Sequence, residues 1–108
     1  MEQQKFKYKG KELIKPLSDL SVLIQDKMRK LKVDVNNFET NNKGSINGLS
    51  MMEKSVDPVY KKYASMCRDY EVFKNDLEKT INWLRECRRA PRACYVLDLQ
   101  DLNWLYRH

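Results

Sequence analysis

The chain has 108 residues, the length of one domain, which excludes a kinase, a TIM barrel or a dinucleotide-binding domain joined to a catalytic one. Hydrophobic residues make up 42% and charged residues 33%, which is typical of neither a membrane span nor a disordered tail. The net charge is +6, a balance that permits contact with nucleic acid or with an acidic partner.

The first segment, residues 1–12, is rich in lysine. Phe6 and Tyr8 alternate with Lys5, Lys7 and Lys9, a spacing found in short edge strands. The sequence shows no evident second strand that could pair with this segment, so we expect residues 1–12 to form a mobile basic arm.

A first helix is predicted from Leu17 to Phe38, with Pro16 at its start. Apolar residues recur there at intervals of three and four, which places them on one helical face. They are Leu17, Leu20, Ile24, Met28, Leu31, Val35 and Phe38.

An Asn- and Gly-rich stretch, residues 39–49, predicts a loop between helices because these residues stop helices. Two helix starts follow it. Ser50 and Glu53 fit a capping box, and Asp57-Pro58 fits a start with proline in the first turn. We favour a short turn followed by a helix that begins at Asp57.

The second helix, from Asp57 to Arg89, carries a heptad pattern typical of coiled coils. Further apolar residues widen this seam, which favours a small bundle over an isolated two-stranded coil. The seam residues are Val56, Val59, Tyr63, Met66, Tyr70, Phe73, Leu77, Thr80, Leu84 and Cys87.

Pro91 ends the second helix, and the apolar segment after it predicts a third helix from Tyr95 to Tyr106. Residues 94–97 could instead form a short extended run. Together these elements predict an all-α fold: a single domain, residues 1–108, built as a small three-helix bundle on a long antiparallel helical hairpin with coiled-coil-like heptads.

The sequence offers few candidate catalytic residues. The one histidine, His108, is the last residue, and Cys67, Cys87 and Cys94 have no metal-binding spacing. We therefore expect no enzyme activity, no bound metal and no cofactor. The odd cysteine count and the absence of a signal-peptide pattern predict an intracellular, cytoplasmic protein with reduced thiols, and leave a nuclear location open.

A row of arginines near the end of the second helix is the sharpest charged feature: Arg85, Arg88, Arg89 and Arg92. With Lys5, Lys7 and Lys9 it could bind phosphates or a carboxylate-rich partner. Alternatively, the arginines neutralise the end of a helix and the lysines keep the arm soluble.

Aromatic and apolar residues supply a second candidate surface, made of Trp104, Leu105, Tyr106, Phe73 and Tyr70. The last helix could dock in a partner's groove or close the protein's own core, and we favour the core. The leading hypothesis is a non-enzymatic module, such as a helical subunit, adaptor or inhibitor, that binds another protein or itself through the seam. The alternative is a basic nucleic-acid-binding regulator.

Overall fold

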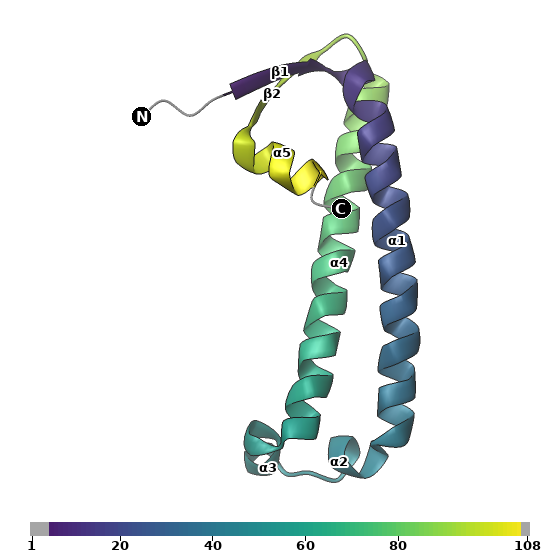
Figure 1. Ribbon diagram of the computed structural model, residues 1–108, viewed down its shortest axis with the longest axis vertical. Helices are drawn as coiled ribbons and strands as arrows, with labels where there is room; N and C mark the ends of the chain where they lie inside the picture. The colour runs from purple at the N-terminus through teal and green to yellow at the C-terminus, as the bar shows by residue number, and fades with distance from the viewer. Residues whose placement is uncertain (1–4, 107–108) are drawn as a thin grey trace. The chain divides into compact units, whose positions relative to one another are not determined.

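Two long helices account for most of the chain in a computed structural model that describes residues 5–106 (Figure 1). Of the described residues 81% are helical, so the fold is broadly all-α as predicted, with one small two-stranded sheet in addition. In chain order the elements are β1 (Lys5–Lys9), α1 (Gly10–Asn41), α2 (Lys43–Asn47), α3 (Met51–Val56), α4 (Pro58–Arg89), β2 (Cys94–Asp98) and α5 (Leu99–Tyr106).

The helices α1 and α4 pack against each other, which confirms the predicted helical hairpin. Gly10 at the start of α1 lies against the end of α4, and Phe38 near the end of α1 stacks on Tyr63 near the start of α4. The two helices therefore run antiparallel. The buried side chains of α1 follow the predicted intervals of three and four, and those of α4 come from the end of the seam: Leu13, Leu17, Leu20 and Ile24 on α1, and Thr80, Leu84 and Cys87 on α4.

The first helix is longer at both ends than the sequence predicts. It begins at Gly10 instead of Leu17, with Pro16 inside it, although proline removes the N–H that would bond to the carbonyl of Glu12. The additional turns bury Leu13 completely, which offsets this loss. At the other end, α1 continues to Asn41, whose neighbour Asn42 donates a side-chain hydrogen bond to the carbonyl of Phe38.

The predicted loop, residues 39–49, is partly helical, because it contains the end of α1 and all of α2, where Ile46 is buried. The two predicted helix starts that follow are both present. The Ser50 hydroxyl accepts a hydrogen bond from the Glu53 amide at 3.3 Å and starts α3, and the Asp57 carboxylate accepts one from the Tyr60 amide at 2.8 Å and starts α4. The short turn expected before Asp57 is therefore α3.

The expectation of a mobile N-terminal arm is wrong for residues 5–9, which form β1 and pair antiparallel with β2. In this register Lys5 lies opposite Asp98, Lys7 opposite Val96, and Lys9 opposite Cys94. The partner strand, β2, includes residues 94–97. An extended conformation of these residues was the alternative to the third helix that we predicted from Tyr95. The aromatic Tyr95 and the β-branched Val96 of β2 favour a half-buried strand.

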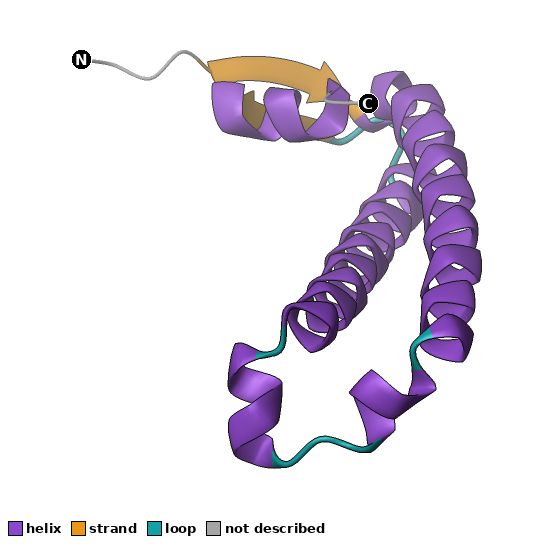
Figure 2. Cartoon of the chain, turned by 60° about the horizontal axis from the view of Figure 1, so that its bottom comes forward, coloured by secondary structure: helices purple, strands orange, loops and turns teal. Residues whose placement is uncertain are grey.

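The third helix consequently starts at Leu99 and not at Tyr95. Asp98 and Asp101 cap it reciprocally: the Asp101 amide donates to the Asp98 carboxylate at 2.8 Å, and the Asp98 amide donates to the Asp101 carboxylate at 3.3 Å. In both views α5 lies on one face of the β1–β2 ribbon (Figure 2).

The chain divides into two compact units. The ribbon unit contains the residues up to Gln25 and those from Asp76 onward, and the loop unit contains Asp26–Asn75. Most of the buried core belongs to the ribbon unit.

The junction between β1 and α1 depends on glycine. A Cβ at Gly10 would stand 2.6 Å from the carbonyl oxygen of Ala90, too close for any other residue without a shift of the backbone. The first amides of a helix lack partners within it. Here the Gly10 amide donates to the carbonyl of Ala93 at 2.9 Å, and the Lys11 amide donates to that of Pro91 at 3.0 Å.

We predict that Gly10→Ala lowers the free energy of unfolding by about 1–3 kcal/mol, because the added methyl forces the two backbones apart. Gly44→Ala is the matched control, since nothing lies within 4 Å of a Cβ at that helical position. It should raise the free energy of unfolding by about 0.5–1 kcal/mol. Denaturant titration followed by circular dichroism measures both, and equal effects of the two variants would contradict the close approach.

Candidate functional site

Cys67, Cys87 and Cys94 are the cysteines of this chain. All three are free thiols, and among residues 5–106 no three His, Cys, Asp or Glu side chains come close enough to hold a metal ion. His108 lies outside the described residues. The absence of enzyme activity stays a prediction.

Cys87 is the most enclosed of the thiols and lies at the end of the seam. Burial raises the pKa of its thiol above the ordinary value, although a hydrogen bond with Tyr95 acts in the opposite direction. The thiolate is therefore scarce, and the side chain serves as a small apolar group in the core. Cys94, on β2, is exposed.

The C-terminal candidate residues are used within the fold. The Trp104 ring stacks on Trp83 with 6.0 Å between centroids, its N–H donates to the Asp76 carboxylate at 3.4 Å, and the Lys79 ammonium lies 4.5 Å from its centre. Leu105 is 3% exposed. Of the two predicted roles for this segment, the structure shows packing against the protein's own core.

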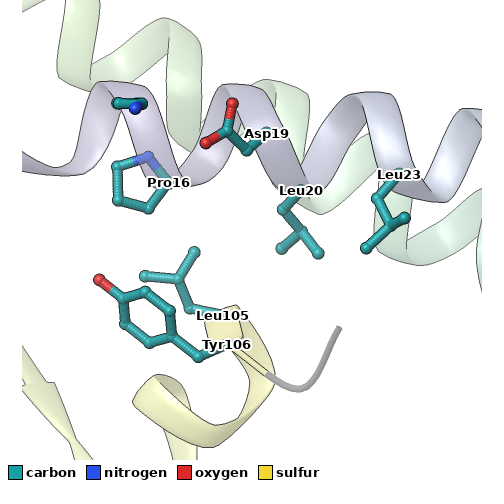
Figure 3. Close-up of a pocket in the computed structure, with 7 residues that line it drawn as sticks. Pro16, Asp19, Leu20, Leu23, Leu105 and Tyr106 are labelled. Carbon is teal, nitrogen blue, oxygen red and sulfur yellow. The ribbon is translucent and has the colours of Figure 1, made fainter.

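Tyr106 remains accessible, beside a cleft of about 260 Å³ between α1 and α5. Figure 3 shows Leu105 and Tyr106 facing Pro16 and Leu20 across this cleft. Lys15 and Asp19 supply its charged lining.

The seam of the loop unit is only half covered. Residues 26–75 are all described, and Ile46 is the one buried side chain among them. Tyr70 and Phe73, both predicted to bind a partner, are half-buried there. A groove of about 370 Å³ opens beside Tyr70, and Val35 and Cys67 also line it.

An aromatic cluster lies in the same unit. Phe38 stacks on Tyr63 with 6.5 Å between ring centroids, and Tyr60 packs against Tyr63 at 6.3 Å. The Tyr63 hydroxyl donates to the Glu39 carboxylate at 3.5 Å. Burial, followed by the neighbouring Cys67 and Glu39, raises the pKa of Tyr63 above its ordinary value.

The most exposed apolar surface of the described residues is α3, which was not predicted from the sequence. Met51 is 86% exposed, Met52 84% and Val56 72%, and this helix has no buried residue. Val56 was predicted to open the seam of α4, but it belongs to α3 and points to solvent. The available signal was the pair of methionines after the Ser50 cap, with no apolar periodicity continuing from them.

The two basic segments, which are far apart in the sequence, meet in the ribbon unit. The backbone bonds from Gly10 and Lys11 to Ala93 and Pro91 join the end of β1 to the link after α4. Lys5, Lys7 and Lys9 are all exposed, and so are Arg85, Arg88, Arg89 and Arg92. Residues 5–15 and 85–92 together hold nine basic and two acidic side chains, and we call this surface the basic end.

We predict that Cys94 reacts readily with iodoacetamide in the native protein, whereas Cys87 is protected until the chain unfolds. Burial and the raised pKa both withhold the Cys87 thiolate. Peptide mapping by mass spectrometry, with and without denaturant and over a pH series, gives the two rates. Native rates that are equal for the two cysteines would contradict the packing of Cys87.

Comparison with known proteins assigns no function. No protein-family model matches the chain, and no curated protein or solved structure matches it either. No helix within residues 5–106 has the length and apolar character needed to cross a membrane. The role of the chain is therefore inferred from the chemistry of its own surfaces.

Proposed function

We propose that the protein is a non-enzymatic binding module that holds another protein through α3 and the half-covered seam of the loop unit. The observation that carries this proposal is the exposure of Met51, Met52 and Val56 on a helix that buries nothing in its own fold. Contiguous exposed apolar surface on a soluble domain marks an interaction site.

The form of this surface favours a partner that supplies a groove. Side chains exposed to this degree protrude, so a concave apolar surface is needed to cover them. Methionine adapts its shape to an irregular groove because it is unbranched and has three rotatable bonds. A short helix that inserts such residues matches the helix-in-groove mode of recognition.

The position of α3 is fixed at both ends of the helix. The Ser50 hydroxyl caps its first turn, and the Lys54 ammonium lies 5.2 Å from the centre of the Tyr60 ring on α4. The Asp57 amide donates to the carbonyl of Glu53 at 2.9 Å, at the end of the helix. Such a preformed helix loses less conformational entropy on binding than a mobile loop would.

The seam is needed as well as α3. Full burial of three such side chains contributes about 1.5–3 kcal/mol each. Association costs about 4–15 kcal/mol in lost freedom of movement, so α3 alone would give weak binding at best. The half-buried side chains Tyr70 and Phe73, with the groove beside Tyr70, offer the additional apolar area. Their heptad spacing is typical of helical bundles.

Photo-crosslinking identifies the partner. A photoreactive amino acid replaces Met52 in the cells that produce the protein, and the matched control carries it at Gln25, an exposed polar position on α1. We expect one discrete adduct with a different polypeptide from position 52 and none from position 25. Adducts that contain only copies of this chain would overturn the proposal of a different partner.

We predict that Met51→Ser, Met52→Ser and Val56→Ser together weaken binding of the purified, crosslink-identified partner by at least about 30-fold, because at least about 2 kcal/mol of the apolar burial is lost. Calorimetric titration measures this, and the free energy of unfolding should change by less than about 0.5 kcal/mol because these side chains are exposed. A triple variant that binds this partner with unchanged affinity would refute the role of α3.

A further inference from the structure

The β1–β2 ribbon has two chemically different faces. Facing residues of an antiparallel pair point to the same side, so Phe6 and Tyr8 share a face with Leu97 and Tyr95. This inner face is half-buried or buried. Lys5, Lys7 and Lys9 are exposed on the outer face, which carries Cys94, Val96 and Asp98 as well.

The outer face is stiff because the inner one is covered. A two-stranded ribbon alone is marginally stable in water. Here Leu97 belongs to the buried core, α5 lies on the inner side, and the reciprocal Asp98–Asp101 cap holds α5 to the end of β2 (Figure 2). The lysines therefore project from a preformed support.

Basic side chains outnumber acidic ones in the basic end, nine to two. Within the basic end, the one ion pair between described residues joins Arg89 to Glu86 at 2.7 Å. Asp98 lies opposite Lys5 and contributes one negative charge at that end of the ribbon, and its carboxylate also accepts the Asp101 amide at the start of α5. The Lys11 amide donates a hydrogen bond to the carbonyl of Pro91, in the link between α4 and β2. Arg92 is the next residue in this link, so arginines and lysines lie on both sides of that bond.

The dimensions of the ribbon suit the major groove of duplex DNA. Five residues per strand span roughly 17 Å, and side chains on one face repeat about every 7 Å. The major groove is about 12 Å wide and admits a two-stranded β-ribbon. Lysine can bond the acceptors of guanine there, and an apolar side chain such as Val96, which is 53% exposed, can contact the methyl group of thymine.

We infer that the protein binds double-stranded DNA by inserting the outer face of the β1–β2 ribbon into the major groove, with Lys5, Lys7 and Lys9 toward the bases and Arg88 and Arg92 on the flanking phosphates. This activity goes beyond the proposed protein binding and uses the other unit of the chain.

Two ordinary roles for these cations make different predictions. Lysines on an edge strand prevent strand-to-strand aggregation, and arginines at the end of a helix stabilise its dipole. Neither role produces DNA binding that depends on position within the chain. An acidic protein as the partner would instead favour binding to a flexible polycarboxylate.

The test is fluorescence anisotropy of a labelled DNA duplex against the full-length protein over a salt series, with a single strand and polyglutamate as competitors. The ribbon variant carries Lys5→Gln, Lys7→Gln and Lys9→Gln. The matched control carries Lys43→Gln, Lys61→Gln and Lys74→Gln, three exposed lysines of the loop unit, and so has the same net charge. Circular dichroism confirms that both variants fold.

We predict that the ribbon variant binds the duplex at least about 10-fold more weakly at physiological salt. Because these lysines face the bases, its slope of log affinity against log salt should change little. Arg88→Gln together with Arg92→Gln should instead lower the slope by about 2, which is close to 0.9 for each phosphate that the protein no longer neutralises. Val96→Asp should weaken binding by a similar factor, because it places a carboxylate in the groove. The control variant should retain most of the affinity.

Four results would overturn the inference: no duplex binding, equal weakening in the ribbon and control variants, stronger binding to the single strand, or displacement of the duplex by polyglutamate at an equal concentration of charge. Loss of duplex binding in the ribbon variant with intact binding of the α3 partner would separate this surface from the proposed protein-binding one.

Discussion

The close approach of Gly10 to the end of α4 is the contact on which the ribbon unit depends. With no side chain at this position, the first two amides of α1 reach the carbonyls of Ala93 and Pro91. These bonds replace the side-chain cap that a helix start otherwise uses. They also fix where β1 ends relative to β2, and so decide which side of the ribbon carries the lysines. A one-residue shift would turn the lysines inward.

The two units differ in how much apolar surface they bury. The ribbon unit holds nearly all the buried side chains, closed by α5 through Leu105 and the Trp83–Trp104 stack. The loop unit keeps its seam half covered and exposes α3. Apolar surface that the fold does not use is the strongest indication of protein binding, whereas the ribbon unit offers charge on a rigid support.

The long helices could be predicted because their apolar residues repeat over many turns, and the caps at Ser50 and Asp57 could be predicted from short local patterns. The pairing of β1 with β2 could not, because five alternating residues are a weak signal and their partner lies at the opposite end of the chain. The start of the first helix was predicted too late because a proline such as Pro16 is typical of a first turn. The helix continues through Pro16 to Gly10, since burial of Leu13 outweighs one lost hydrogen bond. The two basic segments were recognised in the sequence. That they lie close together could not be predicted, because it depends on the pairing of β1 with β2. The exposure of Met51 and Met52 was missed because its signal, two methionines after the Ser50 cap with no apolar periodicity continuing from them, is weak.

Backbone amide hydrogen exchange of the full-length protein, followed residue by residue by NMR, tests the central claim that β1 is an ordered strand joined to the end of α4. If it is, the amides of Gly10 and Lys11, and the β1 amides that bond to β2, should exchange as slowly as those of the neighbouring turns of α1. Exchange of residues 5–11 at the rate of an unstructured chain, while α1 beyond Leu13 stays protected, would contradict the claim and return this segment to a mobile arm.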